Sequence, residues 1–442
     1  MEKSLRKKLL KNEDVSEGAI LFAPLFSKNT YLIDKDGEIV HSWKGSYPPS
    51  NSAYLLEDGT LLRTCSPGIL ANKNIRSTAT GFYVQKISRE GKIIWNFRYS
   101  NKRHRLHHDV CPLPNGNILM LVYEKKTAKE AIAAGREPES IKDGFLLSER
   151  IIEVKPTIPY GGEIVWSWDL WNHLVQDHDS AKKNFGNVSE HPELLDINFS
   201  TNNKPDWVHL NSIDYDAQND QILVSSRTLS EIWVIDHSTT KKESSAHAGG
   251  KSGKGGDILY RWGNPQVYGR GKQNDQQLFG QHDAQWIGKG LPGEGNILIY
   301  NNGDGRPKKE YSSIEEIALP IKKSAYLIEN GKAYGPKKPK WYFSGKKEDH
   351  FYSQHISGVQ RLENGNTLIC VGGKGYFFEI NSKGEKVWDY QNTFCDENIY
   401  EKNLVEVKNY TTSKPGKSSR EKEAVFNFRR YSVEKKAKLF TN

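Results

Sequence analysis

The stretch Ile380-Asn-Ser-Lys-Gly-Glu-Lys-Val-Trp-Asp-Tyr390 contains the pattern that decides the fold. An apolar strand ends, a turn containing Gly384 follows, and the next strand carries two aromatic residues that are two positions apart. Alternation with a period of two places both aromatic side chains on one face of a strand. Glycine supplies the positive φ that tight hairpin turns require. The stretch therefore predicts a β-hairpin with an aromatic pair on its second strand.

This aromatic pair recurs along the chain, and a second hairpin signal follows most of its copies. The six pairs are His41/Trp43, Trp95/Phe97, Trp166/Trp168, Tyr260/Trp262, Trp341/Phe343 and Trp388/Tyr390. The second signal is an Asn-Gly or Asp-Gly turn between alternating apolar residues, as in 55–62, 113–119 and 362–369. Such a turn is a strong short-range signal of a hairpin. Each repeated unit thus predicts two hairpins, which together make a four-stranded sheet.

Six such units indicate an all-β chain that folds as a six-bladed β-propeller with irregular loop insertions. The alternative fold is a pair of β-sandwiches. We expect an N-terminal extension over 1–18, the propeller over 19–435 and a C-terminal tail over 436–442. The Gly- and Lys-rich segment 239–256 is predicted to be a flexible insertion loop.

Helical pattern is sparse. The segment 126–134 predicts a short helix, and 169–205 predicts a long loop with short helical pieces. The segment 411–420 is rich in Ser and Lys, so we expect it to be mobile.

Composition and charge exclude several functional classes. The chain has 442 residues and a formal net charge of +9, but its lysines are spread over loops and ends instead of forming a basic helix or groove. We therefore expect a solvated lysine-rich surface and no nucleic-acid partner. No stretch is long and apolar enough to span a membrane, and the N-terminus lacks a secretory signal. These features predict a cytoplasmic protein, or a periplasmic or secreted one if a leader was removed.

Histidines recur where the innermost strands of the blades are predicted to begin. In a propeller these strand ends meet at one mouth of the central channel, so residues far apart in sequence converge there. The candidate residues are His107 or His108, His209 with Asn211, Arg227, His282 and His355. Asp109 and Asp283 directly follow a histidine, so on a strand they point to the opposite face and are predicted to pack between blades.

Three chemistries fit this group of residues. Several histidines could bind a metal ion, although Arg227 and Asn211 are not typical of a metal site. The group could bind an organic cofactor or another ligand without reaction. Alternatively, one histidine could act as a nucleophile, with the others as acid and base groups and with Arg227 holding a transferred anion.

The chain resembles the bacterial arylsulfotransferase family of six-bladed propellers from about Leu21 to Tyr431. The motifs that carry the resemblance are Thr30-Tyr-Leu-Ile-Asp34, Trp207-Val-His-Leu-Asn-Ser-Ile213, Ser225-Ser-Arg227, Gln281-His-Asp-Ala284, Tyr300-Asn-Asn-Gly-Asp-Gly-Arg306, Ser357-Gly-Val-Gln-Arg-Leu-Glu-Asn-Gly-Asn-Thr-Leu-Ile369 and Val425-Phe-Asn-Phe-Arg-Arg-Tyr431. The resemblance implies ping-pong transfer of a sulfuryl group from a small phenolic sulfate ester to a phenol. It also implies that the reaction needs no cofactor, no metal and no nucleotide sulfate donor.

The resemblance further implies a role for each candidate residue. His282 matches the nucleophile that becomes transiently sulfated, while His209, Asn211 and Arg227 match the groups that bind the sulfuryl oxygens. The remaining active-site histidine falls on His108, with His107 as the neighbouring choice.

His355 has no counterpart in the family and is our own addition as a substrate-binding residue. Well-studied members carry an extra N-terminal β-rich domain, so dimerisation through such a domain cannot be assumed here and the oligomeric state stays open. Two other functions stay open as well: a propeller that binds a ligand or protein without catalysis, and a metal- or quinone-dependent propeller enzyme.

Overall fold

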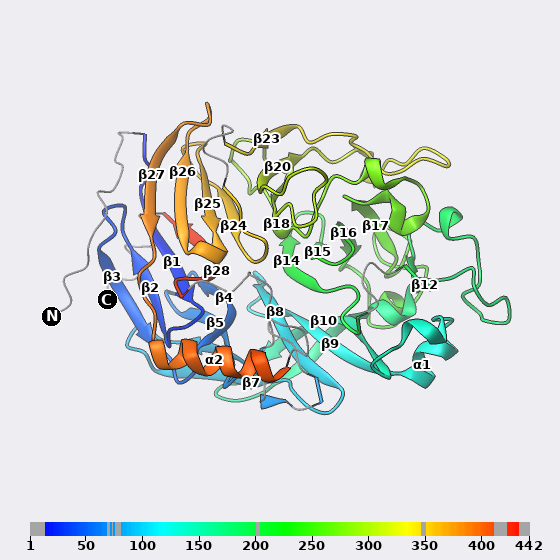
Figure 1. Ribbon diagram of the computed structural model, residues 1–442, viewed down its shortest axis with the longest axis horizontal. Helices are drawn as coiled ribbons and strands as arrows, with labels where there is room; N and C mark the ends of the chain where they lie inside the picture. The colour runs from blue at the N-terminus through cyan, green and yellow to red at the C-terminus, as the bar shows by residue number, and fades with distance from the viewer. Residues whose placement is uncertain are drawn as a thin grey trace.

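Six four-stranded antiparallel sheets surround a common centre in the computed structural model (Figure 1). The structure describes residues 14–68, 71–72, 74–75, 81–199, 204–345, 351–410 and 422–432. From the innermost strand outwards, the sheets are β4 (Pro49–Leu55), β5 (Leu61–Cys65), β6 (Tyr83–Ile87) and β7 (Ile93–Arg98); β8 (His104–Pro112), β9 (Ile118–Thr127), β10 (Phe145–Pro156) and β11 (Gly162–Asp169); β14 (Leu210–Asp216), β15 (Gln221–Ser226), β16 (Glu231–Asp236) and β17 (Ile258–Trp262); β18 (His282–Trp286), β19 (Ile297–Asn301), β20 (Ser313–Ile317) and β23 (Trp341–Phe343); β24 (Gly358–Arg361), β25 (Thr367–Val371), β26 (Tyr376–Ile380) and β27 (Lys386–Gln391); and β28 (Val425–Tyr431), β1 (Ala19–Pro24), β2 (Asn29–Ile33) and β3 (Ile39–Lys44). The predicted all-β six-bladed propeller is confirmed.

One blade combines the two ends of the described chain. The C-terminal strand β28 pairs antiparallel with β1 and becomes the innermost strand of that blade, with Leu21 opposite Arg429 and Ala19 opposite Tyr431. A ring of sheets closed in this way leaves no unpaired sheet edge between the first and the last blade. This closure brings residues near the C-terminus to the central channel.

The predicted aromatic pairs all lie on the outermost strands of the blades, β3, β7, β11, β17, β23 and β27. In five of the six, a tryptophan indole N–H donates to a backbone carbonyl of the following blade, next to that blade's outermost strand. The five bonds are Trp43 to Ser88 (3.1 Å), Trp95 to Gly161, Trp168 to Gly256, Trp262 to Pro336 and Trp388 to Lys35 (2.7 Å each). The same indole contact therefore joins blade to blade around most of the ring.

Carboxylates on the innermost strands join neighbouring blades in a similar way. Asp109 accepts from the Ile213 N–H of the next blade at 3.2 Å, and Asp283 accepts from the Val359 N–H of its next blade at 2.8 Å. Asp283 also pairs with Arg429 on β28 at 2.6 Å. The prediction that Asp109 and Asp283 pack between blades is confirmed.

The insertions are short elements outside the blades. The predicted helix near 126–134 is α1 (Ala128–Ala133), which begins with a capping box from Thr127. The predicted long loop contains η3 (Leu170–Asn172), η4 (Val188–Glu190) and a parallel pair of short strands, β12 (Leu174–Val175) and β13 (Leu195–Asp196). A two-stranded hairpin, β21 (Ile321–Lys322) with β22 (Ala325–Tyr326), precedes β23.

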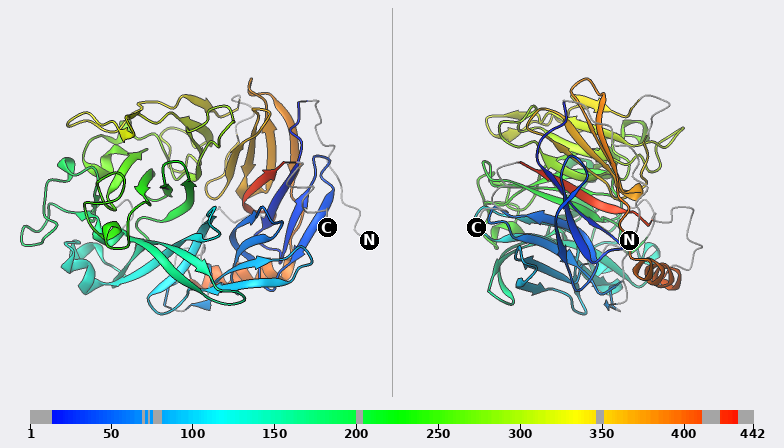
Figure 2. Two further views of the ribbon diagram at one scale, coloured as in Figure 1. Left: turned by 180° about the vertical axis from the view of Figure 1, so that it is seen from behind. Right: turned by 90° about the vertical axis from the view of Figure 1, so that its left-hand side faces the viewer.

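Helix α2 (Glu397–Tyr410) was not predicted from the sequence. It lies outside the sheets (Figure 2), where its Tyr400 packs edge-on against Phe26 in the loop between β1 and β2. In the part of the chain that the structure describes, no helix has the length and apolar character needed to cross a membrane. The predicted tail 436–442 and the predicted mobile segment 411–420 lie outside the described residues.

Candidate functional site

The predicted site histidines lie where the innermost strands begin or are interrupted. His282 is the first residue of β18, His209 directly precedes β14, and His355 lies three residues before β24. His107 and His108 lie inside β8, at the break in its pairing with β9 between Leu106 and Val110. The pairing of β14 and of β18 with their neighbours is interrupted in the same region. These irregularities open the strand ends at one mouth of the channel.

The structure brings most of the predicted residues close together. The rings of His108 and His209 have centroids 4.5 Å apart. The aromatic ring of Phe426, on β28, lies 6.1 Å from the ring of His108 and 6.2 Å from that of His282. The convergence of four blades on one place, which the sequence predicted, is therefore present in the structure.

The backbone at this mouth is strained. His108 (φ 47°), His209 (φ 57°) and Ile356 (φ 52°) all adopt left-handed conformations. Such values are unfavourable for any residue with a Cβ and most of all for a β-branched one such as Ile356. Strain of this kind is typical of functional sites, where the surrounding structure enforces it.

The partners of His282 determine which of its ring nitrogens carries the proton. Asn302 uses both amide hydrogens on the carbonyls of Ser353 (2.8 Å) and Ile356 (2.9 Å), so its Oδ1 must be the atom that faces His282 Nδ1 at 2.7 Å. Since Oδ1 can only accept, Nδ1 carries the hydrogen. The Ile356 N–H in turn donates to His282 Nε2 at 3.2 Å. His282 therefore presents its lone pair on Nε2.

Electrostatics keep His282 neutral. Its burial lowers the pKa of His282 well below the usual value for an imidazole, and the positive charge of Arg227 lowers this pKa further. The charges of His209 and His355 act in the same direction, while the hydrogen bond with Asn302 opposes them. A neutral, oriented imidazole is the form of histidine that can act as a nucleophile.

His209 is oriented by a carboxylate. Its Nδ1 lies 2.6 Å from Asp206 Oδ2, which also accepts from the Tyr123 hydroxyl at 2.8 Å. Burial alone would raise the pKa of Asp206, but the charge and hydrogen bond of His209 outweigh burial and hold this pKa below its usual value. The charged carboxylate holds the proton on His209 Nδ1, so Nε2 of His209 is the nitrogen that can exchange a proton.

The structure distinguishes His107 from His108. The ring of His107 stacks on Tyr123 with centroids 3.7 Å apart, and its Nε2 lies 3.0 Å from Glu149 Oε2 between two fully buried side chains. The orientation there is that of an ion-pair contact and not of a hydrogen bond. His108, whose Nδ1 meets His107 Nδ1 at 2.8 Å, is the one that lies beside His209. His107 therefore lies behind the site, and His108 faces it.

Arg227 and Asn211 lie on β14 and directly after β15, and both contact the blade that carries His282. Arg227 Nη2 pairs with Asp304 Oδ2 at 2.7 Å, and about a quarter of each side chain is exposed. Asn211 is fully buried and donates from Nδ2 to the Gln281 carbonyl at 2.7 Å, which leaves its Oδ1 without a hydrogen-bond partner. Arg227 is thus both a contact between blades, which was the simpler reading of this residue, and a charge close to His282.

Sequence reasoning missed the residues that orient the histidines. Asn302 lies in the quoted motif Tyr300-Asn-Asn-Gly-Asp-Gly-Arg306, so the motif was seen but no role was assigned to it. Asp206 lies three residues before His209, in a turn whose shape the sequence does not reveal. Spacing could have nominated Asp206, whereas Asn302 and His282 meet only through tertiary structure.

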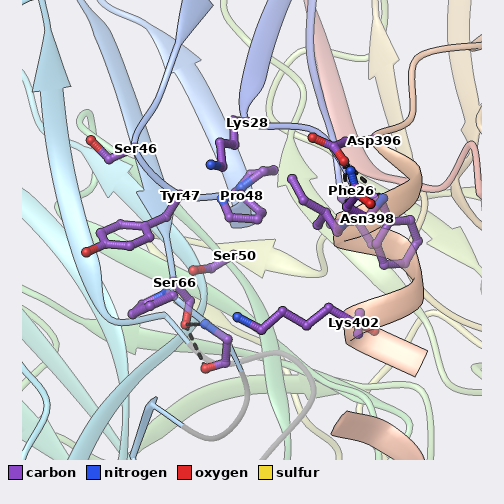
Figure 3. A pocket seen from close by; sticks show the side chains of 16 residues that line it. Phe26, Lys28, Ser46, Tyr47, Pro48, Ser50, Ser66, Asp396, Asn398 and Lys402 are labelled. Atoms are coloured by element: carbon purple, nitrogen blue, oxygen red, sulfur yellow. Dashed lines mark hydrogen bonds between the residues drawn. The ribbon is translucent and has the colours of Figure 1, made fainter. Parts of the chain in front are cut away.

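The hollow drawn in Figure 3 is separate from the histidines. It lies between α2 and the loops that contain residues 25–28, 46–50 and 66–68. None of the seven predicted site residues lines it. Leu25 and Phe26 on its wall belong to the apolar cluster that includes Phe426, so this cluster stands between the hollow and the histidines.

Comparisons with known proteins agree with the motifs quoted above. The family model described as "Arylsulfotransferase (ASST)" matches residues 9–426. The arylsulfate sulfotransferase AssT of Escherichia coli is 24% identical over 303 residues, which cover 62% of this chain and 46% of that protein. AssT of Lelliottia amnigena is 25% identical over 298 residues, with the same coverage. The chain thus spans about half the length of the curated relatives it matches.

Among solved structures, a protein of unknown function from Bacteroides caccae is similar with a TM-score of 0.46 and 14% identity, covering 85% of this chain and 94% of that one. The match to the family model extends over nearly the whole chain and includes all six blades from β1 to the start of β28. The chain therefore belongs to the arylsulfotransferase family.

Proposed function

We propose that the protein is an arylsulfate sulfotransferase that moves a sulfuryl group from an aryl sulfate ester to a phenol through His282. The observation that carries this proposal is the state of His282, a buried neutral imidazole with its lone pair on Nε2 and with Arg227, His209 and His355 as neighbouring cationic groups. A nucleophile surrounded by positive charge suits an anionic electrophile such as a sulfate ester. The names of the AssT relatives support the same substrate class.

In the first half-reaction, the Nε2 lone pair of His282 attacks sulfur, and the bond between sulfur and the aryl oxygen breaks. The electron pair of that bond leaves with the phenolate, which takes a proton from the Nε2 side of His209. Asn302 Oδ1 stays bonded to the Nδ1 hydrogen and stabilises the positive charge that the sulfated ring acquires. Arg227 faces the charge on the sulfuryl oxygens.

In the second half-reaction, the acceptor phenol gives its proton to His209 and attacks sulfur, and the bond between His282 Nε2 and sulfur breaks. His282 returns to its neutral form. Asp206 supports both directions of proton transfer, because it stabilises the protonated form of His209 without moving. His108 lies beside His209 and Phe426, where it can contact the oxygen or the ring of the substrate.

Ile356 has a further place in this scheme. Its N–H occupies the Nε2 lone pair at 3.2 Å in the absence of substrate, so the attack requires this hydrogen bond to be given up. The freed N–H then lies beside the bound sulfuryl group and can donate to one of its oxygens. The strained φ of Ile356 keeps the N–H turned towards His282.

A kinetic experiment tests the proposal. Purified protein is mixed with a chromogenic phenyl sulfate, first without and then with a phenol acceptor. We expect a burst of one phenolate per chain without acceptor, steady turnover with it, and a sulfuryl mass increase on the peptide that contains His282. His282→Ala should lose both burst and turnover, whereas His178→Ala, which removes an exposed histidine far from this site in sequence, should retain both.

Two outcomes would overturn the proposal. One is full turnover by the His282→Ala variant, which would exclude His282 as nucleophile. The other is binding of aryl sulfates without any turnover by the unmodified chain, which would favour a ligand-binding propeller.

A further inference from the structure

Two segments from different blades meet at the outer edge of the propeller, away from the channel. His173 follows β11, and Asp257 precedes β17, which is the outermost strand of the next blade. His247 lies in the loop 239–256 that leads to β17. Hydrogen bonds from the Trp168 indole to the Gly256 carbonyl (2.7 Å) and from the Ser244 hydroxyl to the Ser167 carbonyl (2.7 Å) place this loop against β11.

Three potential metal-ligand atoms converge there. His173 Nδ1 lies 2.8 Å from Asp257 Oδ1, and His247 Nδ1 lies 2.7 Å from the same oxygen. One ligand atom from each residue lies within 4.8 Å of the others. Two imidazole nitrogens from separate segments therefore point at a single carboxylate oxygen.

The second nitrogen of His173 indicates what kind of contact this is. His173 Nε2 lies 2.9 Å from the Ser244 carbonyl, which can only accept, so Nε2 carries a hydrogen. In a neutral His173 the Nδ1 lone pair then faces the Asp257 carboxylate, and two electron pairs oppose each other. Either a proton on Nδ1 or a metal ion between the atoms removes this repulsion.

The pattern around His173 is that of a metal-bound histidine. Such a histidine commonly donates its other ring N–H to a backbone carbonyl, which holds the ring in place. The ring of His173 is also stacked on Trp168, with centroids 5.5 Å apart and planes 4° apart, and its side chain is fully buried. A proton on His173 would account for one contact with Asp257, but it would not explain why His247 converges on the same oxygen.

The cluster is closed on one side and open on the other. His173 and Asp257 are buried, whereas 61% of the His247 side chain is exposed. His247 and Asp257 line a surface hollow together with His191 and Glu193. The Glu193 carbonyl accepts from the Ile258 N–H at 3.0 Å, which places this segment next to Asp257. Water or Glu193 can therefore complete the coordination of a bound ion from the open side.

We propose that His173, His247 and Asp257 bind a divalent metal ion of the zinc class, which fastens the loop 239–256 to the neighbouring blade. Two imidazoles and one carboxylate are ligands that zinc accepts in proteins, with a fourth position for water or a further side chain. The loop contains Gly249, Gly250, Gly253 and Gly255, all at positive φ, so it gains much order from a fixed point at His247. The role is structural, because the site is separate from His282.

The test uses the full chain without an affinity tag of histidines. The protein is stripped with a chelator, and the binding of Zn²⁺ is measured by competition with a chromogenic chelator. Co²⁺ then serves as a spectroscopic probe, since visible d–d absorption reports its coordination geometry. We expect one ion per chain, a tetrahedral Co²⁺ spectrum, a higher melting temperature with Zn²⁺, and slower tryptic cleavage at Lys241, Lys242, Lys251 and Lys254.

His247→Ala is the decisive variant, because this exposed side chain can be removed without disturbing the blade. We expect its affinity for Zn²⁺ to fall by at least about tenfold, with loss of the Co²⁺ spectrum and of the protection from trypsin. His178→Ala is the matched control, an exposed histidine of the preceding insertion that lies 3.7 Å from Glu137 and outside the cluster. Its metal binding should equal that of the unmodified chain.

The proposal is overturned if the unmodified chain binds no stoichiometric Zn²⁺ or Co²⁺. It is equally overturned if His247→Ala binds both ions as well as His178→Ala does. In either case, the cluster is a hydrogen-bonded pair of histidines around Asp257. Sulfuryl transfer is not the readout, so the result is independent of the proposed function.

Discussion

The inner and outer ends of the same blades follow different rules. On the outermost strands the contact repeats, with a buried tryptophan that donates to the next blade in five blades of six. At the channel mouth each blade contributes something different: His108, His209, His282 or Phe426. The repeated contacts build a rigid ring, and the unequal strand starts use that ring to hold one chemical site. Substitutions at the two ends should therefore separate stability from activity.

The largest effect is expected from Arg227→Ala at the inner end. Loss of the guanidinium removes a donor to the sulfuryl oxygens and should lower kcat/KM by about 10²–10³-fold in steady-state assays. The melting temperature should change little, because the side chain is partly exposed. Arg227→Lys keeps the charge but loses the planar fork, so it should recover only part of the activity. An Ala variant with normal kcat/KM would show that Arg227 is only a contact between blades.

Asn302→Ala tests orientation at the inner end. The variant lacks the acceptor that holds the hydrogen on His282 Nδ1, so the ring is free to adopt the wrong tautomer. By analogy with residues that orient metal-bound histidines, we expect a 10–100-fold loss, roughly, in kcat with a smaller change in KM. A nitrogen NMR spectrum of the His282 ring should show its tautomers mixed in the variant and a single one in the unmodified chain. A single unchanged tautomer would contradict this role for Asn302.

Trp95→Phe tests the outer end. The variant keeps the aromatic ring and loses the indole N–H, so the Gly161 carbonyl of the next blade loses its 2.7 Å partner. Denaturant unfolding should show a free energy lower by about 1–3 kcal/mol. The kcat/KM for sulfuryl transfer should be unchanged within error. If activity falls as much as stability does, then the inner and outer ends of the blades are not independent.

The smallest expected effect concerns pH. Burial and the charge of Arg227 lower the pKa of His282, so the acid limb of kcat/KM should lie below pH 6.5, the ordinary imidazole value. His355→Gln removes one positive charge that disfavours the protonated ring. This pKa should rise in the variant, and the acid limb should move to higher pH by less than about one unit. Movement to lower pH would show that His355 acts by another route.

Much of the fold could be predicted because its signals are local. The pair Trp388 and Tyr390, the turn at Gly384 and the Asn-Gly hairpins need only neighbouring residues to be recognised. Helix α2 was missed because its side chains alternate apolar and charged residues without a clear apolar face, and its tertiary contacts include Tyr400 on Phe26. The mobility predicted for the loop 239–256 stays a prediction, although the structure gives this loop bonds to β11.

The candidate site divides in the same way. His209, Asn211, Arg227 and His282 were found from motifs and repeated position, and their catalytic roles stay predictions that the assays above can decide. The choice between His107 and His108 depended on the break in β8, which changes the direction of neighbouring side chains and has no signature in the residue pattern.

The sequence by itself determined the six-bladed ring and the histidines that face its channel, because periodicity and turn chemistry act over a few residues. Only the tertiary structure decided which nitrogen of His282 is free, since Asn302 and Ile356 reach it from other parts of the chain. It also decided that His173, His247 and Asp257 meet at the outer edge. Hydrogen bonds and charges act over a few ångströms in space, so residues far apart in sequence could be joined only by the fold.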